Sequence, residues 1–420
     1  MSTTVVPTPQ PAASGPPADL LDRYNSIRDF LRKYNVERNE EIDLSLLAMI
    51  SGVDLLFLGD PGVGKTFLIE LLTEHCITDV DLFTHLCAKD QSAGEILGER
   101  DPMALKQGRV ARITDGMLPR SNFAYLDEIF KSSPPMLNPM LDIFAKRQLK
   151  VGGKTIDCSQ LVSIFMSSNE LPDREDLMAF RDRIAITKFV EGVKTPDGRR
   201  AVSLIQLGLD SSGIDTTGLL PLTLDEIKAI REQVKLVQVT DAVLETMGDI
   251  EQQCLEAKHP ISQRRKGSIW RMVKAHAWAR GGDIVRPDDF MIAEHMLWNL
   301  ASDVASAHDI VLKYANRFMQ RAAALSQELE PMMSEMDKLK QEIDAATTRE
   351  DKLKVQQSGY HFVSDLEGLK DKARDYLKEG EYEGQDVSDL RDALAQIKRA
   401  TKWTQSVLFG TDDEEEEDED

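Results

Sequence analysis

The chain has 420 residues, with 51 lysines and arginines against 72 aspartates and glutamates, and a formal net charge of −21. That length is enough for two or three domains, and the acidic balance disfavours a nucleic-acid binder that works through a general basic field, although not a local basic patch. The cysteines form no C-x-x-C pair, nothing resembles a signal peptide, and no stretch approaches the roughly 20 apolar residues of a membrane span, so we expect a soluble cytoplasmic protein without a zinc site or disulfide framework.

The composition of the N-terminal stretch changes near residue 18. Residues 1–18 are rich in proline, alanine, serine and threonine, which predicts a disordered leader. From Ala18 to about Lys33, apolar residues share one helical face, at Leu20, Leu21, Tyr24, Ile27, Phe30 and Leu31. We expect a helix there and a second helix over Glu40–Ser51.

The stretch GDPGVGKT at residues 59–66 fits the phosphate-loop pattern G-x-x-x-x-G-K-[ST]. It follows an apolar run, Val53–Leu58, that predicts a buried strand, and it precedes a run that predicts a helix. Glycines let backbone N–H groups turn inward around phosphates, and a helix N-terminus adds positive charge there. A glycine-rich turn without a function is the alternative, which the strand and helix flanks disfavour. The predicted nucleotide-binding residues are Gly59, Asp60, Pro61, Gly62, Val63, Gly64, Lys65, Thr66 and Phe67.

Two of these side chains have specific predicted roles. Lys65 would reach the β- and γ-phosphates as a mobile point charge, and the Thr66 hydroxyl would sit on Mg²⁺. Further along, Asp81–Leu86 is a plausible second strand, and the weak alternation of Gly108–Leu118 around glycines suggests an inserted hairpin.

A second apolar run, Phe123–Leu126, ends in Asp127 and Glu128. It predicts a buried strand whose carboxylates emerge at its end, where ligands bind in parallel sheets. Asp127 would hold Mg²⁺ through its water shell, and Glu128 would orient and polarise the attacking water. An ordinary strand entering an acidic turn is the alternative. The separation from Lys65, roughly 60 residues, favours the ATPase interpretation.

A third buried strand is predicted over Leu161–Met166, followed by polar residues that include Asn169. An amide at that strand end both donates and accepts, so it could sense the γ-phosphate and position water, although a simple turn asparagine is a common alternative. The next segment contains Arg181 and Arg183. A permanently charged guanidinium placed there could reach a neighbouring subunit's nucleotide, and a surface salt bridge is an equal alternative.

The rest of the chain is expected to be helical after a linker. Residues 196–221 are rich in glycine, aspartate, serine and threonine, and residues 222–301 show successive helix starts. Residues 302–409 contain stripes with 3–4 spacing that are too short for a confident coiled coil, so a helical hairpin is favoured. Residues 410–420 form an acidic tail, which we expect to be disordered.

With these pieces in order, the chain resembles AAA+ ATPases of the MoxR family, closest to the RavA-like branch, from about residue 20 to 300. The resemblance rests on several segments in the family's order: 104–119, 123–131, 134–138, 168–172, and 262 through 298. Carried over by position, Lys65 and Thr66 match Walker A, and Asp127 and Glu128 match Walker B. Asn169 matches sensor 1, Arg183 the trans-acting finger, and Arg264, with Arg265 a close second, sensor 2. The typical TQNP sequence at sensor 1 is absent, and the match there is with the RavA-like form.

The resemblance implies an α/β fold: a P-loop AAA+ core of parallel sheet and flanking helices (19–195), an all-α lid domain, and a C-terminal helical hairpin or coiled-coil region. It also implies ATP and Mg²⁺ as cofactors and a homo-oligomeric ring, usually a hexamer, that remodels a protein client, often with a von Willebrand factor A domain partner. An ATP-gated scaffold with little turnover and a nucleic-acid motor are the competing readings. Glu128, Asn169 and Arg183 together favour hydrolysis over the scaffold, and the acidic balance makes nucleic acid an improbable partner.

Overall fold

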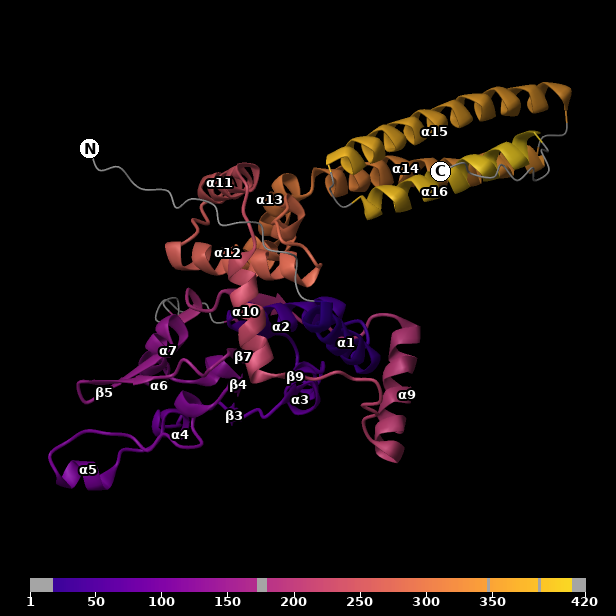
Figure 1. Ribbon diagram of the computed structural model, residues 1–420. Coiled ribbons are helices and arrows are strands. Elements are labelled where there is room, and N and C mark those ends of the chain that lie inside the picture. The colour runs from indigo at the N-terminus through magenta and orange to yellow at the C-terminus, as the bar shows by residue number, and fades with distance from the viewer. Residues whose placement is uncertain (1–17, 172–179, 346–347, 384–386, 410–420) are drawn as a thin grey trace, which may run out of the picture. The chain divides into compact units, whose positions relative to one another are not determined.

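The computed structural model describes residues 18–171, 180–345, 348–383 and 387–409. Residues 1–17 of the predicted leader, Pro172 and the predicted acidic tail lie outside these ranges. The chain forms two compact units, residues 1–310 and 311–420 (Figure 1).

The first unit is built around a five-stranded parallel sheet in the order β3-β4-β7-β1-β8. These strands are β1 (Leu55–Leu58), β3 (Leu82–Leu86), β4 (Phe123–Asp127), β7 (Ser163–Ser168) and β8 (Ile186–Phe189). The central strands β1 and β7 are buried along their whole length, as expected for a parallel sheet covered by helices on both faces. The four strand predictions over Val53–Leu58, Asp81–Leu86, Phe123–Leu126 and Leu161–Met166 are confirmed, whereas β8 was not predicted.

Strand register fixes which loops share an edge of the sheet. In β7, Phe165 pairs with Leu55 and Ser168 pairs with Leu58, so the residues that follow both strands lie together. On the other side of β1, Leu55 pairs with Ile186 of β8. The carboxyl edge of the sheet therefore carries the loop after β1, and the amino edge carries the residues before β8.

Helices and short elements surround this sheet. The first helices, α1 (Ala18–Tyr34) and α2 (Asn39–Ser51), confirm both N-terminal predictions. The remaining elements up to residue 223 are α3 (Lys65–His75), β2 (Ile77–Thr78), α4 (Gly94–Leu97), α5 (Pro102–Lys106), η1 (Leu118–Arg120), η2 (Ile129–Lys131), α6 (Pro134–Leu137), η3 (Asn138–Met140), α7 (Leu141–Lys146), β5 (Gln148–Val151), β6 (Lys154–Asp157), α9 (Pro196–Ser212) and β9 (Leu222–Thr223). Strands β2 and β9 pair in parallel.

The predicted hairpin is in the wrong place. No strand is assigned within 108–118 among the described residues, where an isolated bridge joins Arg100 and Arg112. The antiparallel hairpin is instead β5–β6, in which Val151 pairs with Lys154. Its two turn residues, Gly152 and Gly153, have φ values of 54° and 78°, and a two-residue turn with positive φ at both positions matches the twist of the strands. Two adjacent glycines were thus a stronger hairpin signal than weak alternation.

The linker predicted for 196–221 is also corrected, because it contains the 17-residue helix α9. Thr195 caps this helix by accepting a hydrogen bond from the Gly198 amide, and Pro196 occupies its first turn. The glycine, serine and aspartate content of the segment obscured these start signals and the half-buried face at Val202, Ile205 and Leu209.

The lid region of the first unit is helical, as predicted. It contains α10 (Leu224–Leu236), α11 (Asp241–Glu256), α12 (Gln263–Ala279), the 3₁₀ segments η4 (Pro287–Met296) and η5 (Ala301–Asp303), and α13 (Val304–Ala315). Helices α10, α11 and α12 each have a side-chain cap, from Thr223, Thr240 and Ser262 respectively. Helices α10 and α12 pack on α2, which connects the lid to the sheet.

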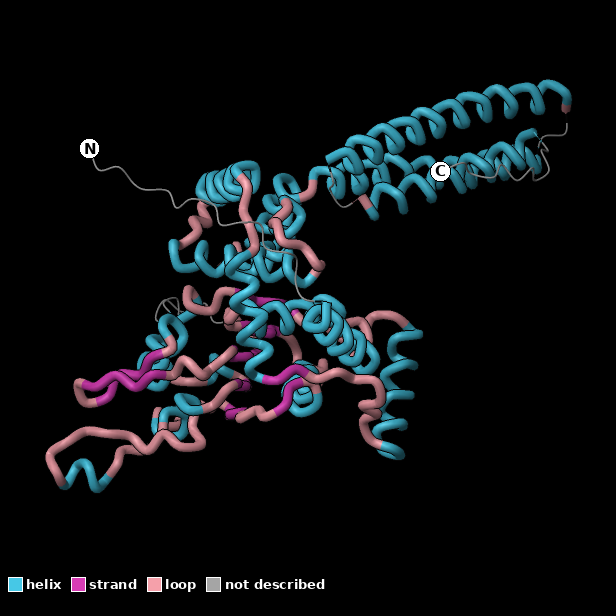
Figure 2. The backbone as a smooth tube through the Cα atoms, viewed as in Figure 1, coloured by secondary structure: helices cyan, strands magenta, loops and turns pink. Residues whose placement is uncertain are grey.

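The second unit contains three helices in its described residues, one more than the predicted hairpin (Figure 2). They are α14 (Arg317–Ala345), α15 (Arg349–Glu383) and α16 (Ser388–Phe409). Their shared core includes Phe318, Leu325, Leu366 and Ile397, contributed by all three helices. The unit begins after Ile310, nine residues beyond the predicted boundary at 301. No described helix of either unit is long and apolar enough to cross a bilayer.

Candidate nucleotide-binding site

The loop after β1 has the backbone that phosphate binding requires. Gly59, Gly62 and Gly64 have φ values of 155°, 83° and 92°, a region that side-chain-bearing residues rarely adopt. A Cβ on Gly59 would lie 2.1 Å from the Val190 carbonyl oxygen, so only glycine fits between β1 and the end of β8. Gly64 is the N-cap of α3, which places the start of a helix at the loop.

The Lys65 ammonium is held at the carboxyl edge of the sheet. Its Nζ donates to the carbonyl oxygens of Gly59 at 2.5 Å and Asp60 at 2.9 Å, and to Asn169 Oδ1 at 3.2 Å. Burial lowers the pKa of Lys65, while the charges of Glu128, Asp127 and Asp60 act in the opposite direction. The structure thus brings together the ends of β1 and β7 through this one side chain.

A hydroxyl network links Thr66 to Asp127. The Thr66 hydroxyl lies 3.0 Å from the Tyr125 hydroxyl, which donates to Asp127 Oδ1 at 3.4 Å. Ser167 also donates to Asp127, and the Glu128 amide donates to the same oxygen at 3.1 Å. Burial raises the pKa of Tyr125 to about 12, which keeps its hydroxyl protonated as a donor. Oxygen ligands of this kind fit Mg²⁺, with Thr66 and Asp127 as the residues that would hold it.

Glu128 is held in a strained backbone conformation directly after β4. Its φ of 54° and ψ of 41° place it in the left-handed region, which is uncommon outside glycine and clusters at functional sites. Its Oε1 accepts a hydrogen bond from the Asn169 amide. Its Oε2 is buried, has no hydrogen-bond partner among the described residues, and lies 3.6 Å from the Lys131 ammonium. One carboxylate oxygen is therefore fixed, and the other keeps its capacity to accept.

The predicted arginines lie apart from this network. Arg183 precedes β8 by three residues, and β8 begins opposite Leu55, so Arg183 belongs to the amino edge of the sheet. The four residues of β1, roughly 13 Å at about 3.3 Å per residue, separate that edge from the phosphate loop. Arg264 joins the same region, because its Nη1 lies 2.8 Å from Asp182 Oδ2.

Arg181 and Arg265, the predicted alternatives to Arg183 and Arg264, are both buried in the protein. Arg181 is buried, with 5% of its surface exposed, whereas Arg183 is half-buried. Arg265 is also buried and donates to the Trp298 carbonyl at 3.3 Å and to Asn299 Oδ1 at 2.9 Å, which fixes the C-terminal side of the lid. These contacts favour Arg183 and Arg264 as the side chains able to meet a ligand.

Sequence reasoning missed several residues that shape the site. Arg38, at the start of α2, donates to the carbonyl oxygens of Val63 at 3.1 Å, Glu37 at 2.8 Å and Glu191, and so ties α2 to the phosphate loop and the end of β8. Tyr125 could have been suspected, since it lies two residues before Asp127 on the same strand face. Nothing in the sequence signals Arg38, whose partners are 25 and 153 residues away.

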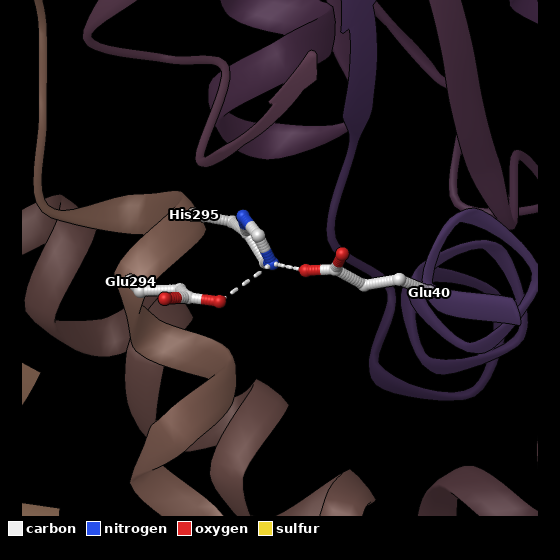
Figure 3. A group of neighbouring side chains, drawn as sticks. All are labelled: Glu40, Glu294 and His295. Atoms are coloured by element: carbon white, nitrogen blue, oxygen red, sulfur yellow. Dashed lines mark ion pairs between the residues drawn. The ribbon is translucent and has the colours of Figure 1, made fainter. Parts of the chain in front are cut away.

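A charged cluster of Glu40, Glu294 and His295 joins α2 to the lid (Figure 3). The three residues line a cavity of about 400 Å³. His295 Nε2, from η4, lies 2.5 Å from Glu40 Oε1 of α2 and 3.3 Å from Glu294 Oε1. Lys188 of β8 pairs with the second oxygen of Glu40, and His308 of α13 pairs with the second oxygen of Glu294. This cluster connects α2 and β8 to the lid close to the nucleotide site.

The parallel sheet, the phosphate loop and the carboxylates after β4 define a P-loop ATPase of the AAA+ class. A family model of the MoxR domain in MoxR–vWA–beta-propeller ternary systems matches residues 22–228, and a model of an AAA lid domain matches residues 225–311. The chain belongs to the MoxR family of AAA+ ATPases.

The similar proteins do not name an activity. Two uncharacterized proteins of Methanocaldococcus jannaschii, MJ0079 and MJ0812, are 27% and 26% identical over 76% and 91% of this chain and 81% and 99% of their own lengths. A structural protein, ORF618, of Acidianus two-tailed virus is 31% identical over 41% of this chain and 28% of its own. A crystal structure of a candidate ATPase from Cytophaga hutchinsonii matches with a TM-score of 0.56 at 16% identity, covering 71% of this chain and 96% of that one, which supports the fold.

Proposed function

We propose that this protein hydrolyses ATP with Mg²⁺ as a ring-shaped homo-oligomer, a hexamer by family resemblance, and uses the cycle to remodel a protein client in the cytoplasm. The observation that carries the proposal is the linked set of Lys65, Asn169 and Glu128 at one edge of the sheet. A nucleotide-gated scaffold needs Lys65 and the loop, but it has no need for a strained carboxylate with one oriented oxygen.

We assign a role to each of the predicted site residues at this edge of the sheet. The loop amides and Lys65 would bind the β- and γ-phosphates, and Thr66 and Asp127 would hold Mg²⁺, which would supply charge neutralisation at the phosphate oxygens. Glu128 accepts a hydrogen bond from the attacking water through Oε2, while its Oε1 stays on Asn169. Asn169 also contacts Lys65, so it links the lysine that would bind the γ-phosphate to Glu128, which would orient the attacking water.

The arginines act across subunits. Arg183 and Arg264 lie at the edge of the sheet remote from their own phosphate loop, joined through Asp182. In a closed ring, a head-to-tail interface sets this edge of one subunit against the nucleotide of the next. Arg183 then supplies the finger to the γ-phosphate and Arg264 the second positive charge, both in trans.

The client is a protein, and a von Willebrand factor A domain partner is the first candidate. The matching family model is described from systems that pair MoxR with vWA and beta-propeller components. The net charge of −21 argues against a nucleic-acid motor. The RavA-like branch is proposed from the form of the segment around Asn169.

Glu128→Gln tests hydrolysis directly. The amide keeps the size of the side chain but is a far weaker base, so ATP should bind normally while turnover falls by about 10²- to 10⁴-fold. Glu74→Gln, on the exposed face of α3, makes the same charge change and should leave both unchanged. Turnover close to that of the unsubstituted chain in Glu128→Gln would favour the scaffold, and stimulation by nucleic acid would favour the motor. The same variant, with ATP trapped, is the reagent for capturing the client and a vWA partner.

A further inference from the structure

A basic cavity lies at the amino edge of the sheet, at the opposite end of β1 from the phosphate loop. It has a volume of about 610 Å³ and lies between α10, α12 and the turn at Gly52 that precedes β1. Six of its lining residues are basic: Arg147, Lys228, Arg231, Lys235, Arg271 and Lys274. Glu232 is the one acidic residue among those that line it. In a chain with a net charge of −21, this concentration of positive charge is the reverse of the average surface.

Helical spacing produces the cavity's charge. On α10, Lys228, Arg231 and Lys235 follow each other at intervals of three and four residues, which places them on one face. On α12, Arg271 and Lys274 are three residues apart and also share a face. Two helices thus present basic faces to one cavity, where lid helices normally bury apolar side chains.

Carboxylates match only half of these charges. Arg147 forms a two-pronged pair with buried Asp54, at 2.6 and 2.9 Å. Lys228 and Lys235 pair with Asp225 and Glu232 within α10.

The other three basic residues contact uncharged oxygens in the described part of the chain. Arg231 donates to the carbonyls of Met49 and Val162 at 2.7 and 2.6 Å. Arg271 donates to the Gly52 carbonyl and the Ser268 hydroxyl, and Lys274 to the Lys235 carbonyl. None of these three side chains forms a salt bridge among the described residues, although the charge of Asp54 acts to raise the pKa values of Arg231 and Arg271.

Holding these charges together has an electrostatic cost. Burial and, after it, the neighbouring charges of Arg147 and Arg271 together lower the pKa of Arg231 to about 10, against the opposing charge of Asp54. Burial likewise lowers the pKa values of Arg271 and Lys274. A bound anion would offset both the desolvation and the repulsion.

We propose that this cavity is a second anion site, which takes a small molecule that carries a chain of phosphates. Arg271 and Lys274 bind the phosphate oxygens from α12, and Arg231 contributes positive charge from α10 across the cavity. Half-buried Trp270 also lines the cavity and offers an aromatic surface to a base if the phosphates belong to a nucleotide. Since the wall includes α10, α12 and the residues before β1, the bound anion stabilises the contact between lid and sheet.

Calorimetric titration with inorganic tripolyphosphate tests the site on the full chain. The unsubstituted chain should bind two equivalents, one at the phosphate loop and one in the basic cavity. Lys65→Ala should retain one equivalent, and adding Arg271→Gln and Lys274→Gln should weaken that remaining site at least tenfold, because each substitution removes a charge-assisted hydrogen bond. Lys33→Gln, an exposed residue of α1, is the control with the same charge change and should have no effect on either site.

Further measurements distinguish a nucleotide from a free phosphate chain, and a single variant is available in case the double variant does not fold. Tighter binding of ATP than of tripolyphosphate in Lys65→Ala, with a change in tryptophan fluorescence that Trp270→Phe removes, identifies a nucleotide; equal binding identifies a free phosphate chain. Lys274→Gln alone, on a half-buried side chain, replaces the double variant if that one does not fold. The proposal is overturned if the second equivalent is absent, if Lys33→Gln weakens it equally, or if the cavity variants alter ring assembly without altering anion binding.

Discussion

The two edges of the central sheet differ in which charged residues they carry and in what those residues contact. At the carboxyl edge, Lys65, Asp127 and Glu128 lie among neutral donors and acceptors such as Asn169, Ser167 and Tyr125. At the amino edge, permanently charged arginines gather, with few titratable partners beyond Asp54 and Asp182. The arrangement at the carboxyl edge suits catalysis, because a general base and metal ligands need lone pairs that point in fixed directions. The amino edge holds fixed positive charge, which is suited to binding anions supplied from outside.

The largest expected effect is on ATP affinity, which should fall for a substitution at the carboxyl edge and stay unchanged for substitutions at the amino edge. Lys65→Ala removes the ammonium that contacts the phosphates, so ATP affinity should fall by about 100-fold or more. Arg183→Ala and Arg264→Ala should leave the affinity of an isolated subunit unchanged, because in the proposed ring their charges would act on a neighbour's nucleotide. Equilibrium binding of a fluorescent ATP analogue measures all three. Equal losses in Lys65→Ala and Arg183→Ala would place both side chains at one site and remove the distinction.

A smaller effect tests the hydroxyl network of the carboxyl edge. Tyr125→Phe removes the hydroxyl between Thr66 and Asp127, and a lost hydrogen bond of about 1 kcal/mol predicts a several-fold rise in the Mg²⁺ concentration needed for half-maximal turnover. Tyr360→Phe, in an exposed part of α15, is the matched control. An unchanged Mg²⁺ requirement would mean that Thr66 and Asp127 are positioned without Tyr125.

The smallest effect concerns the cluster that joins sheet and lid. Burial would raise the pKa of Glu40, but His295 and Lys188 outweigh it and lower the pKa from 4.5 to about 2. A lowered folded-state pKa stabilises the fold above pH 4.5 and loses that contribution as the pH falls toward 2. Glu40→Gln should therefore be less stable than the unsubstituted chain at pH 6, and the gap should narrow between pH 4.5 and 2.

The size of that gap is limited by solvent. The Glu40 side chain is 47% exposed, so screening should keep the difference below about 1 kcal/mol. Denaturant unfolding at several pH values, with Glu74→Gln as the control, measures it. A gap that stays constant down to pH 2 would show that the charge of Glu40 contributes nothing.

Local signals explain why the carboxyl edge could be predicted from the sequence. A buried strand, three glycines and a lysine occur within 14 residues of each other. Asp127 follows an apolar run directly, and Asn169 follows another after two serines. In a parallel sheet, such residues meet because strand ends align. The fold class was predictable for the same reason, since the alternation of buried strands and helices specifies the core.

The parts that were missed depend on distant contacts. Arg38 reaches Glu191 across 153 residues, and the basic cavity needs α10, α12 and Arg147 to converge. Helix α9 was hidden by a composition typical of loops, although its cap and proline were present at Thr195 and Pro196. Helix α15 of the second unit was missed because the apolar stripes within 302–409 were interpreted as the two helices of one hairpin.

We propose that one edge of each subunit's sheet performs the chemistry and the other serves a neighbouring subunit, and subunit mixing tests this division most directly. Arg183→Ala and Lys65→Ala should each be nearly inactive alone, the former by a factor of about 10³ or more. In mixed rings, the intact Arg183 of a Lys65→Ala subunit can meet the intact phosphate loop of an Arg183→Ala neighbour, so ATPase activity should reappear on mixing. No recovery in rings shown to be mixed, or full activity of Arg183→Ala alone, would contradict the claim.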